Sequence, residues 1–423
     1  MKILFIAHRT PYPPDKGEKI RAYHILSHLA RRHVVSVVYW VDDPKDVEHR
    51  FFLRKLCRGK VMPVRLNKFT AKMRAISSLT AGRSFSQGYY YARKFRRVVD
   101  RLLNAHSYDA IYVFSSPMAS YVEGRHDLPR IVDFVDLDSD KWGQLAQFAK
   151  FPLSTLYRIE QERLSRYEVA ISNWARWSLF ISPTEADLFT SIGGRGSVVV
   201  VPNGADLDVR RLPLDQVPFC GAGGSAVEQP EGEKLIFVGT MNYYPNADAV
   251  LYFARDIFPL IRRKYPRAIF EIVGRFPPRS VRRLDGVDGV RVVGEVGDVR
   301  SFLIQADVSV APMRIAQGVQ NKVLEALGMG VPVVATSQAL KGLDIRQGQE
   351  ILIGDTPEQF AMQVMRLLSD AQLRNFITKG AWNKVKQAYN WEAIGAKVDG
   401  LITGLQRGAA KGRPIKDAPV WHT

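Results

Sequence analysis

The sequence predicts an α/β protein with two Rossmann-like, doubly wound domains that face each other across a cleft. In its first half, short apolar runs that are mostly separated by helical stretches predict a parallel sheet. These runs are KILFIAH, VVSVVYW, VMPVRL, DAIYVFS, RIVDFVD, SLFIS and SVVVVPN. A stretch rich in Pro, Gly and acids at 208–233 then interrupts the alternation, as linkers do. The alternation restarts with KLIFVGT, AIFEIVGR, VRVVGEV, VSVAPM, PVVAT and ILIGD, which predict a second sheet.

These boundaries give an N-terminal domain at 1–207 and a C-terminal domain at 234–385. After the first strand, GEKIRAYHILSHLARRH predicts a helix, and AVLYFARDIFPLIRRKY at 249–265 predicts an amphipathic helix of the second domain. A C-terminal helix at 386–406 is expected to pack back on the first domain, ahead of a basic tail at 407–423. Because ligands of doubly wound sheets bind beyond the carboxyl ends of the strands, we expect the functional site there.

Composition places the chain among globular proteins of the reducing cytoplasm. A length of 423 residues exceeds the size of a single core, and 46% hydrophobic content is enough to bury two. The first apolar run ends at His8, so it predicts neither a signal peptide nor a membrane span, and no later run approaches the ~18 apolar residues of a spanning helix. Cys57 and Cys220 are too few and too far apart for a disulfide framework or a metal site. We therefore expect a protein of the reducing cytoplasm.

The positive charge is concentrated in one segment. Residues 50–101 hold fifteen Lys and Arg against one acid, Asp100, and so carry +14 of the total charge of +18. Eight Phe and Tyr are interleaved with these cations, as expected for a surface that lies against anionic lipid. A solvated face with some aromatics in the core is the alternative, and nucleic acid would attract the same segment.

Of these three interpretations, we favour the membrane and expect no nucleic-acid partner. The protein would then be peripheral on the inner face of the cytoplasmic membrane. The cations expected to contact an anionic membrane surface are Arg93, Lys94, Arg96 and Arg97.

The stretch GVQNKVLEALGMG predicts an anion site at the start of a short helix. Lys322 lies in the first turn, where the helix dipole disfavours a cation unless an anion is also present. Free N–H groups in this region would bind a diphosphate beyond the sheet. The residues expected to form this part of the site are Gly318, Val319, Gln320, Asn321 and Lys322. Glu325 can accept hydrogen bonds from two ribose hydroxyls, and an ordinary surface ion pair with Lys322 is the alternative.

The loop after the first strand lacks the GxGxxG pattern of a dinucleotide site, so a dehydrogenase is not expected. Its one glycine, Gly17, opens the following helix. Gly17 either lets a substrate approach the backbone closely or simply shapes the loop.

Four segments resemble glycosyltransferase family 4, which has the GT-B fold: APMRIAQGVQNKVLEALGMGVPVVAT, VVPNGADL, SPTEADLF and PYPPDKGEKIRAYHIL. The similarity covers nearly the whole chain. FVGTMNYYPNADAVLYFA and VDFVDLDSDKW are most similar to sugar transferases of exosortase-linked exopolysaccharide loci. The resemblance implies retaining transfer of a sugar from a nucleotide-diphosphate donor to a glycan acceptor, such as one carried on a polyprenyl diphosphate. It also implies that the protein binds no metal and needs no cofactor, since the nucleotide-diphosphate sugar is a substrate.

The resemblance implies roles for two residues of the family's E-x7-E pattern. Glu325 matches the second glutamate and would hold the ribose of the donor. Gln317 replaces the first glutamate, so it would contact the transferred sugar without carrying charge.

The Arg/Lys pair that the family carries after the first strand of the donor domain is missing from GTMNYYPN, which begins at Gly239. Lys322, with Arg314 or Arg275, would then neutralise the leaving diphosphate. Gly239 is counted among the donor-binding residues. Backbone groups at the end of VRVVGEV would recognise the base; they belong to Gly294, Glu295 and Val296.

The acceptor side is predicted from VDFVDLDSDKW. Many relatives carry a His-Asp pair after this strand, whereas here Val135 occupies the histidine position and Asp136 the aspartate position. Asp136 and Asp138 are candidates for orienting or deprotonating an acceptor hydroxyl, with helix capping as the alternative. The DLD triplet also matches a metal motif of a different glycosyltransferase fold, but the two-domain alternation argues against that fold. His8 and His24 are expected to be structural.

Two other classes of protein stay open. A non-hydrolysing nucleotide-sugar epimerase shares the twin-domain architecture and the grip on a diphosphate, but it has no need of a basic, aromatic membrane face. A catalytically silent nucleotide-sugar-binding protein is the other. The sequence names neither the sugar, the base nor the acceptor.

Overall fold

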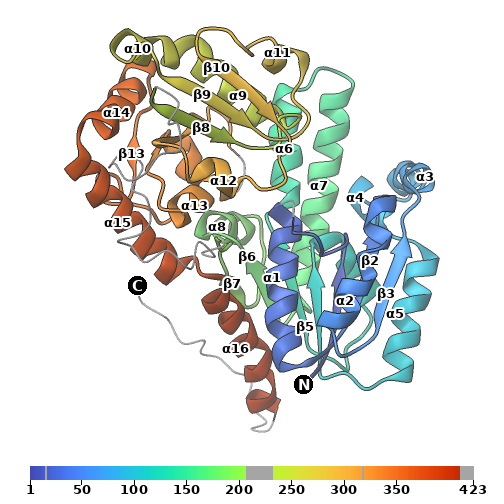
Figure 1. Ribbon diagram of the computed structural model, residues 1–423. Coiled ribbons are helices and arrows are strands. Elements are labelled where there is room, and N and C mark those ends of the chain that lie inside the picture. Colours follow the sequence, from blue (N-terminus) through green and yellow to red (C-terminus); the bar gives the residue numbers. More distant parts are fainter. Residues whose placement is uncertain (15–16, 206–231, 317–318, 410–423) are drawn as a thin grey trace. The chain divides into compact units, whose positions relative to one another are not determined.

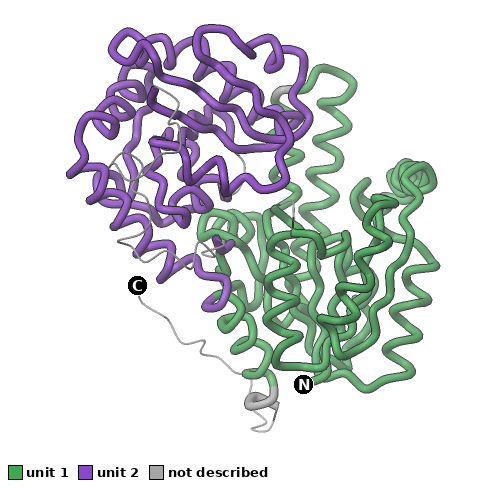
Figure 2. Tube along the Cα trace, viewed as in Figure 1, with its two compact units in different colours: residues 1–202, 394–423 green, residues 203–393 purple. Residues whose placement is uncertain are grey.

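The computed structural model describes residues 1–14, 17–205, 232–316 and 319–409. Unit 1 comprises residues 1–202 and a C-terminal segment from Ile394 onward, and unit 2 comprises residues 203–393 (Figure 2). Most of the predicted linker, most of the predicted basic tail, and Cys220 lie outside the described residues.

Unit 1 contains a seven-stranded parallel sheet with the order β3-β2-β1-β4-β5-β6-β7 (Figure 1). Its strands are β1 (Lys2–Ala7), β2 (Val34–Val41), β3 (Val61–Arg65), β4 (Ala110–Phe114), β5 (Arg130–Val135), β6 (Trp177–Phe180) and β7 (Val198–Val200). The order reverses between β1 and β4, which is the switch point of a doubly wound sheet. Helices flank this sheet, and β1 and β4 are accordingly buried almost throughout.

The helices of unit 1 are α1 (Gly17–Arg32), α2 (Arg50–Leu56), α3 (Lys68–Thr80), α4 (Phe85–Tyr90), α5 (Arg93–Ala105), α6 (Asp138–Phe148), α7 (Leu153–Ser172) and α8 (Pro183–Ser191). Most of α16 (Trp391–Ala409) also belongs to this unit. Asp399 of α16 lies 2.6 Å from Nε2 of His33 and 3.3 Å from Nη1 of Arg32. A Cβ atom at Gly395 would lie 2.3 Å from the His28 ring, so the helices approach closely at that point.

A fully buried ion pair joins four elements of unit 1. Arg21 of α1 donates two hydrogen bonds to the Asp133 carboxylate of β5, at 2.9 and 3.0 Å. The Tyr112 hydroxyl of β4 donates to the same carboxylate at 2.6 Å. Arg21 also donates to the carbonyl oxygens of Val201 and Pro202, just after β7. Satisfying every group in this way is what makes a buried charge tolerable.

Unit 2 contains a six-stranded parallel sheet with the order β10-β9-β8-β11-β12-β13, which reverses at the corresponding place. Its strands are β8 (Lys234–Val238), β9 (Ile269–Val273), β10 (Val290–Gly294), β11 (Val308–Ala311), β12 (Val333–Ala335) and β13 (Leu352–Ile353). Its helices are α9 (Tyr244–Tyr252), α10 (Phe258–Lys264), α11 (Arg279–Arg282), α12 (Arg300–Leu303), α13 (Asn321–Gly328), α14 (Pro357–Ser369) and α15 (Ala371–Ala388). Each predicted strand run contains a strand, so the predicted α/β class with two doubly wound sheets is confirmed.

One predicted helix is interrupted. Residues 249–265 do not form a continuous α-helix, because a π-helical turn at Phe253–Ile257 separates α9 from α10. Pro259 explains the break, since it has no N–H group and its ring crowds the carbonyl four residues earlier.

No helix within the described ranges is long and apolar enough to cross a membrane.

Candidate functional site

The carboxyl ends of the unit 2 strands are held together by backbone hydrogen bonds. The N–H of Gly274, after β9, donates to the carbonyl of Gly294 at 2.7 Å, and the N–H of Gly239, after β8, donates to Val273 at 3.0 Å. Gly274 has φ +149°, and a Cβ atom there would lie 1.7 Å from the carbonyl oxygen of Gly239. Only glycine fits at such a close backbone approach. The predicted donor residues Gly239 and Gly294 therefore lie at one edge of the sheet.

The side chain of Lys322 projects into this edge from α13. Its ammonium group donates to Oδ1 of Asn246 at 2.5 Å and to Oε1 of Gln320 at 3.4 Å. It also lies 4.7 Å from the centre of the Phe237 ring. Asn246 belongs to α9 and Phe237 to β8, so three elements position this one cation.

The environment of Lys322 lowers the pKa of its ammonium group, so its charge depends on pH and on a bound anion. Burial lowers the pKa of Lys322 to about 7, and the negative charge of Glu325 limits the fall. Glu325 is half-buried on the same helix, three residues on. An anion bound beside Lys322 would favour its protonated form.

The start of α13 is also suited to an anion. The helix begins at Asn321, and Gln320 occupies the N-cap position without a capping bond from its side chain. The side chain of Asn321 accepts a hydrogen bond from Asn203 at 3.1 Å. Val319 and Gln320 are buried, whereas the predicted contacts Gln317 and Gly318 lie outside the described residues. With a lysine and no acid in its first turn, α13 keeps its N-terminal dipole available to an anion.

The other predicted cations of unit 2 have carboxylate partners. Arg314 makes an ion pair with Asp248 at 2.5 Å and lies over the Tyr252 ring. Arg275 makes an ion pair with Glu295 at 3.0 Å, and Val296 follows directly. The charges of Arg314 and Arg275 are therefore partly neutralised, while the ammonium of Lys322 is bound through amide oxygens.

In unit 1, Asp136 and Asp138 lie just after β5 and share one lysine. The ammonium of Lys141 lies 2.7 Å from Asp136 and 3.1 Å from Asp138. The N-cap position of α6 is occupied by Leu137, whose side chain has no polar atom, and both acids bind Lys141. Although burial opposes it, the two carboxylates raise the pKa of Lys141, and the lysine keeps its charge. Val135, immediately before, has φ +70°, a strained conformation for a β-branched residue.

Two further carboxyl groups complete this edge, and sequence reasoning missed both. Burial, together with the charge of Asp138, raises the pKa of Glu168 on α7 to about 8. Burial, together with the charge of Asp136, raises the pKa of Glu185 on α8 to about 7. Glu185 also accepts a hydrogen bond from the N–H of Leu137 at 2.7 Å. Its place in SPTEADLF was the available signal, while Glu168 has no sequence signal beyond its position on a helix.

His8, at the end of β1, packs as a core aromatic residue. Its ring stacks on Phe114 with centroids 5.7 Å apart and meets Tyr90 edge-on at 5.6 Å. Burial lowers the pKa of His8, so its imidazole is neutral near pH 7. Nδ1 has no hydrogen-bond partner among the described residues.

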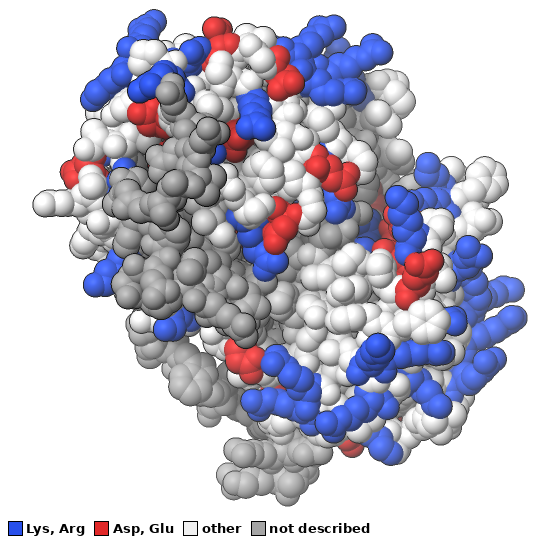
Figure 3. All heavy atoms as spheres, in the orientation of Figure 1, with Lys and Arg blue, Asp and Glu red and all other residues white. Residues whose placement is uncertain are grey.

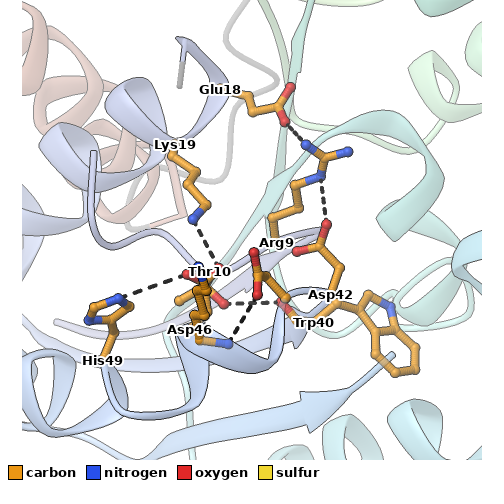
Figure 4. Close-up of polar contacts among 10 residues, drawn as sticks. Arg9, Thr10, Glu18, Lys19, Trp40, Asp42, Asp46 and His49 are labelled. Carbon is orange, nitrogen blue, oxygen red and sulfur yellow. Dashed lines mark hydrogen bonds and ion pairs between the residues drawn. The ribbon is translucent and has the colours of Figure 1, made fainter. Parts of the chain in front are cut away.

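The predicted substrate contact Gly17 is the first residue of α1, and the next two residues, Glu18 and Lys19, belong to a network of ion pairs (Figure 4). Arg9 pairs with Glu18 in the first turn of α1 and lies 3.6 Å from Asp42. Lys19 makes a buried ion pair of 2.9 Å with Asp46. These contacts tie the start of α1 to the loops that follow β1 and β2.

A cavity of about 370 Å³ lies beyond the carboxyl ends of β2 and β3. Its lining residues are Val41, Asp42, Pro44, Arg65, Leu66, Asn67, Lys68 and Phe69. None of the predicted site residues lines it. Within the described parts of the chain, no group of three or more His, Cys, Asp or Glu side chains is placed to hold a metal ion.

The four predicted membrane contacts lie in the first half of α5, and two of them are engaged within the protein. Lys94 donates to the carbonyl of Arg65 and lies over the Trp40 ring. Arg96 binds Asp100 at 3.2 Å and the carbonyl of Ser120 at 3.1 Å. Arg93 and Arg97 are exposed, and Phe95 between them is fully buried. On α5, exposed cations thus flank a buried aromatic residue, and the predicted membrane contact of this helix stays a prediction.

A known protein family matches part of unit 2. Residues 232–370, which include Lys322, Glu325 and Asn246, match the family of glycosyl transferases group 1. The match therefore lies within unit 2 and covers about a third of the chain. The chain is 25% identical over 163 residues to "Glycosyltransferase 1 domain-containing protein 1" of Xenopus tropicalis, covering 37% of this chain and 47% of the relative. It is 26% identical over 269 residues to "Phosphatidyl-myo-inositol mannosyltransferase" of Propionibacterium freudenreichii, covering 62% of each. The chain therefore spans less than two thirds of the length of either relative.

Solved structures share the fold over nearly the whole chain. Sucrose-phosphate synthase from Thermosynechococcus elongatus superposes with a TM-score of 0.70 at 17% identity, covering 96% of this chain and 100% of that one. Anabaena HepE in complex with UDP and glucose gives 0.65 at 15% identity, covering 95% and 99%. A "putative UDP-N-acetylglucosamine 2-epimerase" from Listeria monocytogenes gives 0.56 at 12% identity, covering 99% of each chain. The predicted GT-B fold is confirmed.

Proposed function

We propose that the protein is a glycosyltransferase that takes a sugar from a nucleoside-diphosphate donor bound by unit 2. The observation that carries this proposal is the position of Lys322. It lies at the start of α13, inside a group 1 glycosyl transferase domain, with amide partners and a pKa lowered by burial to about 7. A diphosphate is the ligand that matches both this ammonium and the dipole of the helix. HepE, which has a similar fold, was solved with UDP and glucose, which supports a nucleoside diphosphate as the donor.

In the proposed complex, Lys322 neutralises the diphosphate and Glu325 binds the ribose. Gln317 contacts the transferred sugar, and the loops after β8 and β10 hold the base. As the bond between the anomeric carbon and the phosphate oxygen breaks, negative charge collects on the leaving diphosphate. Lys322 is placed to stabilise that charge where it develops.

The acceptor is a glycan hydroxyl, which Asp136 or Asp138 orients from unit 1. The family resemblance supports transfer with retention, by attack of the acceptor oxygen on the same face from which the phosphate departs. The acceptor proton then passes to the departing phosphate oxygen, so no enzymic nucleophile is needed. The same resemblance supports a polyprenyl-diphosphate acceptor, an exopolysaccharide or cell-envelope pathway, and a peripheral place on the cytoplasmic membrane.

An epimerase is the second candidate. A putative UDP-N-acetylglucosamine 2-epimerase shares the architecture, although its TM-score of 0.56 is lower than the 0.70 of sucrose-phosphate synthase and the 0.65 of HepE. Such an enzyme would bind the diphosphate in the same way but act on the donor sugar itself.

Incubation with labelled nucleotide sugars and polyprenyl-diphosphate sugars separates these activities. A lengthened lipid-linked glycan, together with release of nucleoside diphosphate, is the expected result. Isomerised donor without transfer identifies an epimerase. Saturable binding of nucleoside diphosphate with neither product identifies a binding protein, and absence of binding refutes the donor site.

A further inference from the structure

Helix α3 presents an apolar stripe to solvent. Phe69, Met73 and Ile76 follow one another at intervals of four and three residues, so they share one face of the helix. Their exposed fractions are 73%, 54% and 55%. Three large apolar side chains on one exposed face are unusual for a solvated helix and indicate a partner.

The stripe belongs to a firmly packed helix. The opposite face of α3 is buried through Ala71, Ala75 and Ser78. Ser78 faces Gly88 of α4, where a Cβ atom would lie 2.3 Å from the Ser78 hydroxyl, so the two helices approach closely. The hydroxyl of Ser78 also donates to the carbonyl of Ser84 at 2.8 Å.

Helix α7 fixes the turn between α3 and α4. Arg163 donates to the carbonyl of Leu79 at 2.5 Å and to that of Arg83 at 3.1 Å. Glu160 accepts hydrogen bonds from the N–H groups of Phe85 and Ser86. With its inner face and its end both held, α3 presents Phe69, Met73 and Ile76 as a preformed surface.

The charge around the stripe is positive. Lys68 and Lys72 are exposed on α3, and no acid occurs between residues 50 and 99. Lys and Arg also gather along the side of unit 1 that carries α2, α3 and α5 (Figure 3). A second copy of this face would meet it with like charge, which disfavours self-association. An anionic bilayer offers both apolar depth and negative headgroups.

We propose that α3 docks on an anionic membrane surface, with Phe69, Met73 and Ile76 inserted into the interface and Lys68 and Lys72 against lipid phosphates. This locates the membrane contact on α3, whereas the sequence placed it at the cations of α5. The proposal deepens the peripheral membrane association proposed above, but its test uses neither donor nor acceptor. Its failure and that of the glycosyltransferase proposal are therefore distinguishable.

The test is co-sedimentation of the full chain with vesicles of phosphatidylcholine, with and without phosphatidylglycerol. The variant Phe69→Gln/Met73→Gln keeps helix-compatible side chains and all charges, and we expect it to bind anionic vesicles roughly tenfold more weakly than the unchanged protein. The matched control is Met362→Gln/Phe376→Gln, which removes a Met and a Phe with exposed fractions of 48% and 61% from helices of unit 2. We expect the control to bind like the unchanged protein. Ile76→Gln alone serves if the double variant fails to fold.

A second arm separates α3 from α5. Lys68→Gln/Lys72→Gln and Arg93→Gln/Arg97→Gln each remove two exposed cations, and we expect the α3 pair to lose more vesicle binding.

Undiminished binding by Phe69→Gln/Met73→Gln, or an equal loss in its control, overturns the proposal. Equal binding to vesicles without phosphatidylglycerol overturns it as well. The proposal is also overturned if light scattering shows a dimer that the Phe69→Gln/Met73→Gln substitutions convert to monomer while vesicle binding stays unchanged.

Discussion

The carboxyl-end edges of the two sheets are held together by different interactions. In unit 1, charged side chains do this: Arg21 binds Asp133, and Lys141 bridges Asp136 and Asp138. In unit 2, the backbone does it, through the close approach of Gly274 to Gly239. The cations at the unit 1 edge are therefore occupied by carboxylates, whereas Lys322 in unit 2 has only partly compensated charge. Two sheets with the same strand reversal thus offer different chemistry: a lysine held by amide oxygens in unit 2 and a carboxyl-rich edge in unit 1.

The largest expected effect concerns the buried ion pair. Arg21→Met should lower the free energy of unfolding by roughly 3–5 kcal/mol, because it leaves the Asp133 carboxylate buried without its partner. Urea unfolding followed by circular dichroism measures the loss. Adding Asp133→Asn removes the stranded charge, so the double variant should recover part of the stability. If the double variant is less stable than Arg21→Met, charge pairing is not what holds the unit 1 edge.

The corresponding change in unit 2 is Gly274→Ala. A residue other than glycine at such a φ costs about 1–3 kcal/mol, and the clash with Gly239 adds to this. Gly286→Ala is the control, since Gly286 also has a positive φ but no atom within 4 Å of its would-be Cβ. Thermal unfolding should show the larger loss for Gly274→Ala. Equal losses would mean that backbone conformation matters at this edge and the close approach does not.

The proposed contacts to the nucleotide-sugar donor are tested by Lys322→Ala and Glu325→Ala. Each should reduce turnover at least tenfold, about 1.4 kcal/mol of transition-state stabilisation, with little change in melting temperature. Lys322→Ala should weaken binding of UDP more than binding of uridine, as measured by calorimetry. Arg314→Gln is the comparison variant, and we expect a smaller loss because Asp248 already neutralises that cation. Equal losses for UDP and uridine would place Lys322 away from the phosphates.

The smallest expected effect is a pH dependence of UDP binding. With the pKa of Lys322 lowered to about 7, UDP binding must recruit a proton above that pH, so affinity should fall as pH rises from about 7 to 8. The unfolded chain, with an ordinary lysine pKa, binds more protons in the window above about 7, so the contribution of Lys322 to stability increases with pH there. Calorimetry across this range measures the first effect. A slope that persists unchanged in Lys322→Ala would assign the titration to another group.

Local sequence patterns predicted most of the fold. Apolar runs bounded by turn residues located each strand of the described residues, because burial on both faces of a parallel sheet demands such runs. The apolar periodicity of 249–265 predicts one helix, but periodicity alone does not register that Pro259 removes a backbone N–H within it. For the site, the unusual placement of a lysine at a helix start singled out Lys322. Glu185 was marked only by its place in SPTEADLF, and Glu168 had no sequence signal beyond its position on a helix.

The sequence by itself determined which segments become strands, how much charge the first domain carries and which helix carries a lysine in its first turn. These are properties of neighbours along the chain, fixed by side-chain periodicity and composition. Only the tertiary structure decided that Asn246, seventy-six residues away, binds Lys322, and that Lys141 occupies both acids after β5. It also decided that the basic segment buries Phe95 of α5 but exposes Phe69 of α3. Such outcomes depend on which faces meet when distant segments pack, and the local pattern of a helix does not specify the neighbour that covers it.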